Sequence, residues 1–128
     1  RELLRSVQYF KRKILGNPNE GLRISYKGGI HIIKYSDIQY CKGSGNYTQI
    51  FLVSGKSIFA TIQLQKLRTI LESAQQFERI GKSYIFNIFN IKSLDNCHVS
   101  FLGVKNETLE LSELYTKRLR GILLGVPD

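Results

Sequence analysis

The sequence predicts a mainly β fold decorated by small helices. From residue 22 onward, apolar and polar residues alternate with a period of two over many short runs. Glycine and asparagine turn signals separate these runs. Within this region two segments, near residues 64 and 113, follow the period of an α-helix instead. Strands and helices therefore do not alternate as a doubly wound sheet requires, which favours a β fold.

The first segment, residues 2–14, is predicted to be an amphipathic helix. Its apolar positions follow a 4-3-4 spacing at Leu3, Val7, Phe10 and Ile14. Packing on the flank of its own domain and pairing with a second copy are both open to such a helix. Pro18 and the glycines around it break the helical pattern. Residues 1–21 are therefore expected to form an interdomain linker with a helical arm.

Residues 22–124 are expected to form the folded domain, and residues 125–128 a C-terminal tail. The predicted strands are residues 22–27, 30–35, 37–42, 47–53, 56–60, 77–80, 84–87, 91–94, 97–102 and 108–111. Gly28 and Gly29 are expected to turn the first hairpin, and residues 43–46 to form a longer polar loop.

Two helices are predicted within this domain. The first follows Thr61, the expected N-cap, and buries Leu64, Leu67, Ile70 and Leu71 on one face. The second begins near Glu113 after Ser112, another expected N-cap, and ends at Gly125. Its inward residues are expected to be Tyr115, Leu119, Ile122 and Leu123.

Composition limits the class of protein. The 128 residues are long enough for one domain with a real core, and no apolar run reaches the length of a membrane span. Cys41 and Cys97 are too few and too distant in sequence for a disulfide framework, which indicates reduced thiols and a cytoplasmic location. The formal charge of +9 makes a polyanion the first partner to consider. Because the chain opens at Arg1 without an initiator Met, we expect it to come from a longer protein.

The sequence offers no enzyme chemistry. The lone Gly-x-Gly of residues 43–45 is followed by no third glycine and no helix, so nucleotide-phosphate binding is not supported. Cys41, Cys97, His31 and His98 lack the spacing of metal ligands. Cys97 and His98 are adjacent in a predicted strand and are expected to point to opposite faces. We therefore expect no catalytic residues, no metal and no cofactor.

Polar and basic residues instead gather in the predicted loops. Asn46, Thr48 and Gln49 carry groups that can donate and accept hydrogen bonds at base edges. Lysines in or beside loops, at Lys42, Lys82 and Lys105, can reach phosphates, and Ser83 lies beside one of them. A basic surface that serves only solubility, on a protein-interaction or dimerisation module, is the alternative. Single-stranded nucleic-acid binding would need exposed aromatic residues. However, the strand aromatics are expected to be mostly buried: Tyr47, Phe51, Phe77, Tyr84 and Phe101.

The order of several short motifs resembles the LytTR DNA-binding domain. Ile38-Gln39-Tyr40 and Gly45-Asn46-Tyr47 precede a leucine-rich helix. Then follow Phe77-x-Arg79-x-x-x-Ser83-Tyr84-Ile85-x-Asn87, Ile91, and Leu111-Ser112-x-x-Tyr115. The resemblance covers residues 22–123. It implies an elongated array of short antiparallel sheets with small flanking helices, in the output module of a bacterial response regulator.

The resemblance also implies partners and a site. Such domains read successive major grooves of duplex DNA with loops, and they usually follow a receiver domain, which would lie upstream. We expect a monomer in isolation, with pairing on DNA or through the upstream domain. This chain has Gly81 where family members commonly have His, and Lys82 where they have Arg or Asn. It also has Glu113 where they commonly have Arg. Lys117 or Arg118 can compensate for the last change. The expected DNA-binding residues are Lys42, Asn46, Tyr47, Thr48, Gln49, Lys82, Ser83, Lys105, Asn106, Lys117 and Arg118.

Overall fold

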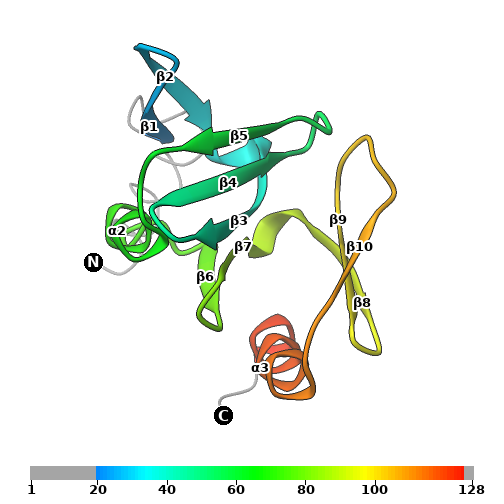
Figure 1. The fold of residues 1–128 in the computed structure, drawn as a ribbon. Helices are drawn as coiled ribbons and strands as arrows, with labels where there is room; N and C mark the ends of the chain where they lie inside the picture. The colour runs from blue at the N-terminus through cyan, green and yellow to red at the C-terminus, as the bar shows by residue number, and fades with distance from the viewer. Residues whose placement is uncertain (1–19, 126–128) are drawn as a thin grey trace, which may run out of the picture.

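The computed structural model describes residues 20–125, so the predicted helix at residues 2–14 lies outside the described residues. Ten short strands and two α-helices form this part of the chain (Figure 1). The strands are β1 (Gly21–Tyr26), β2 (Gly29–Lys34), β3 (Ile38–Ser44), β4 (Tyr47–Leu52), β5 (Ser57–Ala60), β6 (Phe77–Ile80), β7 (Tyr84–Asn87), β8 (Ile91–Asp95), β9 (His98–Phe101) and β10 (Thr108–Glu110). The helices are α2 (Leu64–Ile70) and α3 (Glu113–Leu124). The predicted mainly β fold is confirmed.

The strands form three antiparallel sheets. β1 pairs with β2, a five-stranded sheet has the order β5-β4-β3-β7-β6, and a three-stranded sheet has the order β10-β9-β8. Most neighbours in the sheets are also neighbours in sequence, because short hairpin turns connect antiparallel strands directly. The exception is β3, which pairs with β7 and so places the β3–β4 and β6–β7 hairpins side by side.

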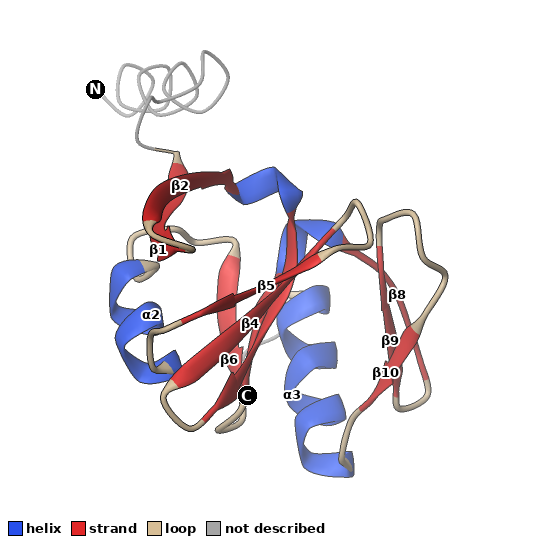
Figure 2. Cartoon of the chain, turned by 45° about the horizontal axis from the view of Figure 1, so that its top comes forward, coloured by secondary structure: helices blue, strands red, loops and turns tan. Residues whose placement is uncertain are grey.

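The five-stranded sheet separates two apolar cores. Leu64 and Leu67 of α2 pack with buried strand residues such as Cys41, Ile50 and Ile85. Side chains alternate across a strand, so the neighbours of these residues face the opposite way. There, aromatic residues pack with α3 and the three-stranded sheet: Tyr40, Tyr84, Phe86 and Phe101. Figure 2 shows α2 and α3 on opposite sides of the sheet.

Several local predictions were wrong by one or two residues. The first hairpin turns at Lys27-Gly28, both with positive φ, and Gly29 already pairs with Tyr26. The polar loop predicted at residues 43–46 is a two-residue turn, because β3 continues to Ser44 and pairs there with Tyr47. A two-residue turn needs positive φ, which Gly45 supplies at +61°.

The predicted N-cap of α2 and two predicted core residues of the helices were also wrong. The N-cap of α2 is Gln63 rather than Thr61, and its side chain caps no backbone N–H. Ile70 is 47% exposed and Leu123 38% exposed, so neither is a core residue. The predicted limits of α3 are confirmed: the Ser112 hydroxyl accepts from Tyr115 N–H, and Gly125 ends the helix in the left-handed conformation.

Candidate nucleic-acid interface

The β6–β7 turn carries Lys82 and Ser83 on a backbone that hydrogen bonds fix in place. Its three residues, 81–83, are closed by the pairing of Ile80 with Tyr84. The Arg79 side chain makes two hydrogen bonds to the turn: its Nε donates to the Gly81 carbonyl (3.2 Å) and its Nη2 to the Lys82 carbonyl (2.9 Å). With the backbone fixed in this way, the exposed side chains of Lys82 and Ser83 project into solvent.

Gly81 lets α3 approach the turn closely. Its φ is +75°, a conformation that costs little only for glycine. A Cβ at this position would lie 2.5 Å from Cε2 and Cζ of the Tyr115 ring. Tyr115 is on the first turn of α3, so this contact sets the distance between the helix and the β6–β7 turn. The packing of Tyr115 therefore explains why this chain has Gly81 at the position where the resembled family commonly has histidine.

Beside this contact lies a basic hollow of about 670 Å³. Its lining includes Gly81, Leu114 and Tyr115 together with five cationic side chains and no carboxylate. The cations come from α2, β6, the β6–β7 turn and α3: Arg68, Arg79, Lys82, Lys117 and Arg118. Five positive charges around one open surface favour a ligand with several negative charges, such as a phosphate backbone.

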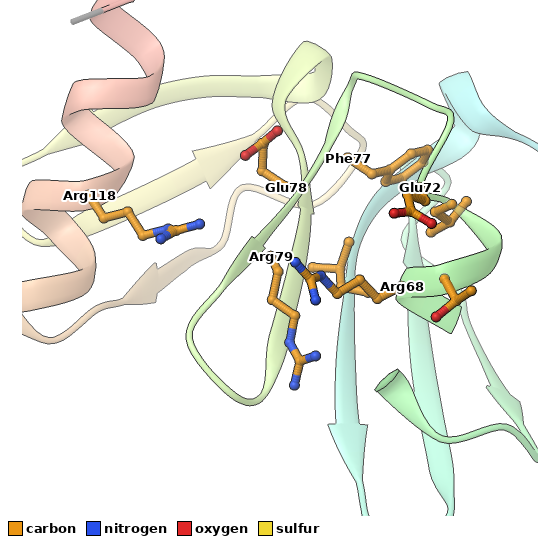
Figure 3. A pocket seen from close by; sticks show the side chains of 9 residues that line it. Arg68, Glu72, Phe77, Glu78, Arg79 and Arg118 are labelled. Carbon is orange, nitrogen blue, oxygen red and sulfur yellow. The ribbon is translucent and has the colours of Figure 1, made fainter. Parts of the chain in front are cut away.

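On the neighbouring side the charge is mixed. Figure 3 shows a smaller pocket, about 240 Å³, where Arg68 of α2, Arg79 of β6 and Arg118 of α3 lie near Glu72 and Glu78. Three cations there face two carboxylates, so the net positive charge is smaller than in the basic hollow. The local positive charge is therefore greater in the basic hollow, on the side of Lys82 and Lys117, than in this pocket.

The β3–β4 turn lies next to the β6–β7 turn. Gly43 N donates to the Ser83 carbonyl (2.8 Å), which joins the β3–β4 hairpin to the β6–β7 turn. At the tip, the side chain of Asn46 accepts a hydrogen bond from Gln63 Nε2 (3.0 Å). Gln63 precedes α2, so the helix holds the Asn46 amide in position. The structure thus brings the sequence-predicted Asn46, Lys82 and Ser83 to one end of the molecule.

Three other predicted residues follow along the hairpin. Lys42 and Tyr47 are exposed, and Lys42 is paired across the ladder with the half-buried Gln49, whose Nε2 donates to Ser57 Oγ (3.0 Å). Tyr47, 52% exposed, departs from the expected burial of the strand aromatics. These three side chains belong to the same face of the sheet, because Lys42 pairs with Gln49 and Tyr47 is two residues from Gln49.

Thr48 lies on the opposite face. It is fully buried, and its hydroxyl donates to the Ile62 carbonyl (2.7 Å). This hydrogen bond ties β4 to the segment before α2, so we assign Thr48 a structural role and leave it out of the proposed interface.

Lys105 and Asn106 lie at the far end of the sheet. Val104 N donates to the Val53 carbonyl (2.8 Å), and the aliphatic part of Lys105 covers Gly55 in the β4–β5 turn. The six residues of β4 separate this turn from the β3–β4 turn, which corresponds to about 17 Å. The structure therefore does not join Lys105 and Asn106 to the basic hollow.

Sequence reasoning missed three contributors to the site: Arg68, Arg79 and Tyr115. Arg79 and Tyr115 stood in the family motif without an assigned role, and Arg68 lies on a helix rather than in a loop. Their common position at the hollow depends on α2, β6 and α3 meeting in space. A basic residue on an exposed helix face carries no sequence signal for such a meeting.

The strongest pKa shifts in the described residues belong to core groups. Burial, with Tyr84 and Glu107 nearby, raises the pKa of Tyr40 to about 12. Burial alone raises the pKa of Cys41 to about 12. Both groups stay neutral near pH 7, and their shifts follow from packing rather than from a catalytic arrangement. Among the described residues, no helix is long and apolar enough to cross a membrane.

One prediction about side-chain direction was wrong. Cys97 and His98 do not point apart, because Cys97 belongs to the β8–β9 turn and β9 begins only at His98. The alternation rule applies within a strand and not across its first residue. Cys97 Sγ lies 3.7 Å from His98 Nδ1.

Two of three comparisons with known proteins found a match. The model of the LytTr DNA-binding domain matches residues 28–124. A search of curated proteins found no match. Among solved structures, a LytTr DNA-binding domain from Bacillus cereus, named as part of a methyl-accepting/DNA response regulator, superposes with a TM-score of 0.61 at 19% sequence identity. That alignment covers 84% of this chain and 98% of the other, and at this identity it shows a common fold.

Proposed function

The chain belongs to the LytTR family of DNA-binding domains, and from this premise we propose that it binds duplex DNA sequence-specifically as the effector domain of a bacterial transcriptional regulator. The observation that carries the proposal is the basic hollow of five cations beside two joined hairpin turns. Phosphate contacts from such cations position a protein on DNA, while polar side chains at the turn tips can read base edges.

In this proposal the two hairpin turns enter one major groove together. The groove, about 12 Å wide, admits a two-stranded β ribbon or a helix. Asn46 and Lys82 are the reading residues, since an amide can pair with adenine and an ammonium with guanine. Lys117 and Arg118, together with Arg68, contact the phosphates that border the groove. Arg79 is a positioning residue, because all three nitrogens of its guanidinium group donate to protein acceptors.

Lys105 and Asn106 form a second, separate contact in this proposal. They lie beyond the opposite end of β4, so they would meet the backbone at another part of the site. A contact of this kind adds affinity without choosing a sequence. We also propose that the domain follows a receiver domain in the full protein, as expected for a response regulator.

The salt dependence of binding tests the electrostatic part. If each of the four cations assigned to phosphates (Arg68, Lys105, Lys117 and Arg118) neutralises one phosphate, log K falls with log salt with a slope of about −3.6, or about 150-fold between 50 and 200 mM. Fluorescence anisotropy with a duplex selected from genomic fragments measures this slope. An affinity independent of salt would contradict the proposal.

Single substitutions test the assignment of roles. Lys82→Ala and Asn46→Ala should each lower the cognate-to-scrambled affinity ratio by about 1–3 kcal/mol, because each removes a base contact. Lys105→Ala is the matched control and should weaken both duplexes alike. If Lys82→Ala leaves the ratio unchanged while binding remains salt-dependent, the reading turn is wrongly assigned.

A protein-interaction module is the second candidate function. Ile30 and Ile32, 77% and 62% exposed, lie on the same face of β2, and exposed apolar residues of this kind suit a protein partner. An Ile30→Ser/Ile32→Ser variant separates the two functions. Loss of DNA affinity in this variant would favour a role for the β1–β2 hairpin in the DNA complex. Unchanged DNA affinity would favour the hairpin as a contact surface for a protein partner.

A further inference from the structure

Three metal-ligating side chains converge at one end of the three-stranded sheet. Cys97 lies in the β8–β9 turn, His98 begins β9 and Glu110 ends β10. One ligand atom from each, a thiol sulfur, an imidazole nitrogen and a carboxylate oxygen, lies within 4.8 Å of the other two. The distance from Cys97 Sγ to His98 Nδ1 is 3.7 Å.

We propose that Cys97, His98 and Glu110 form a binding site for Zn²⁺ or a similar transition-metal ion. Tetrahedral zinc, with a Zn–S distance of about 2.3 Å and a Zn–N distance of about 2.0–2.1 Å, separates sulfur from nitrogen by about 3.6 Å. The thiol and the imidazole already have nearly this separation. Thiolate and imidazole ligands select zinc over magnesium or calcium, which prefer oxygen.

The backbone holds these three residues in place. Asn96 takes a positive φ of 54° in the turn, and Cys97 O accepts from Leu111 N (2.8 Å). His98 and Glu110 are directly paired in the β9–β10 ladder, and directly opposed residues have Cβ atoms about 4.5–5.5 Å apart. Closing the site therefore needs only rotation of side chains, those of the half-buried Cys97 and of the exposed His98 and Glu110. Three protein ligands leave a fourth position for water or another donor.

The position of the site suggests what an ion would do there. Glu110 is two residues before Ser112, the N-cap of α3. An ion bound to Cys97 and Glu110 would tie the β8–β9 turn to the strand that leads into this helix. Binding to the folded state alone raises its stability by mass action. This inference concerns metal binding only and is independent of the proposed DNA contacts.

Titration of residues 1–128 with Co²⁺, and then with Zn²⁺ in competition, tests the site. We expect one ion per chain and a thiolate-to-cobalt charge-transfer band in the near ultraviolet, because Cys97 supplies the sulfur. Cys41 cannot supply it, since that thiol is fully buried in the core. Zn²⁺ should abolish the band and raise the melting temperature of the protein.

Cys97→Ser, His98→Gln and Glu110→Gln test the three ligands separately. Each should weaken Zn²⁺ binding by about tenfold or more, and Cys97→Ser should also remove the charge-transfer band. Matched controls are His31→Gln, at an exposed histidine in the first hairpin, and Glu107→Gln, at an exposed carboxylate outside the cluster. Controls that weaken binding as much as the ligand variants, or a wild-type protein that shows no thiolate band, would overturn the proposal.

Discussion

Gly81→Ala should destabilise the domain more than a substitution at any other glycine with the same backbone conformation. An alanine at φ +75° has a left-handed strain of about 1–2 kcal/mol. The added Cβ also lies 2.5 Å from the Tyr115 ring, about 1 Å closer than carbon atoms at their optimum. Relieving such a clash costs about 1–3 kcal/mol. The total is about 2–5 kcal/mol.

Gly125→Ala isolates the backbone contribution. Gly125 has φ +70°, and a Cβ there meets nothing within 4 Å. Its substitution should therefore cost only the strain, less the unfolded-state entropy that alanine removes, which leaves about 1 kcal/mol. Urea denaturation followed by circular dichroism measures both variants.

A double-mutant cycle tests the origin of the difference. In a Tyr115→Ala background the ring is gone, so Gly81→Ala should cost no more than Gly125→Ala. The coupling energy between Gly81 and Tyr115 should be about 1–3 kcal/mol. Equal costs for the two glycines in the wild-type background would refute the close packing of α3 on the β6–β7 turn. Gly81→Ala should also lower the affinity for duplex DNA measured by fluorescence anisotropy, because the turn carries Lys82.

Three further outcomes are expected. Asn87→Ala should lower the free energy of unfolding by about 2–4 kcal/mol, because the buried Asn87 amide donates to the Tyr35 and Ile38 carbonyls and accepts from Gln76 and Phe89. Asn90→Ala removes a partly exposed amide that donates to the Ser36 and Ile38 carbonyls, so it should lower stability less in the same urea titration. The free energy of unfolding should fall between pH 9 and 12, by up to about 1.4 kcal/mol per pH unit, because burial raises the pKa of Cys41 from 9.0 in the unfolded chain to about 12 in the folded one, and the stability that the neutral thiol contributes is lost as pH rises through that value. Cys41→Ala should flatten this part of the pH profile, and a profile that the substitution leaves unchanged would contradict the prediction. Sedimentation of residues 1–128 should show a monomer without DNA, and a tight dimer that disappears in residues 20–128 would show that the predicted arm carries dimerisation.

Local signals made most of the fold predictable. Period-two runs and turn residues located all ten strands, because each hairpin is built from neighbouring segments. Errors arose where two signals competed. Gly28 and Gly29 both suit a turn, and only the pairing of Gly29 with Tyr26 decides between them. The burial of Thr48 was also invisible, since its partner, the Ile62 carbonyl, is a backbone group placed by tertiary structure.

The candidate site was less predictable because it depends on contacts between elements far apart in sequence. Asn87 illustrates the limit: the family motif includes it, yet its structural role appears only when the carbonyls of Tyr35 and Ile38 converge on its amide. Similarly, the distance between Lys105 and Lys82 follows from the length of β4 and from the loop that covers Gly55. Loop position alone grouped these two lysines, and the structure separates them.

The departures from the family pattern have one structural logic. Gly81 removes a side chain where the Tyr115 ring must pack, so the β6–β7 turn keeps its place with Lys82 at its tip. Glu113 lies in the first turn of α3, where a negative charge favours the helix N-terminus, and it is not among the residues that line the basic hollow. The Glu113 carboxylate therefore places no negative charge in the lining of the hollow. The cationic surface persists because Lys117 and Arg118, one turn further along the same helix, face it.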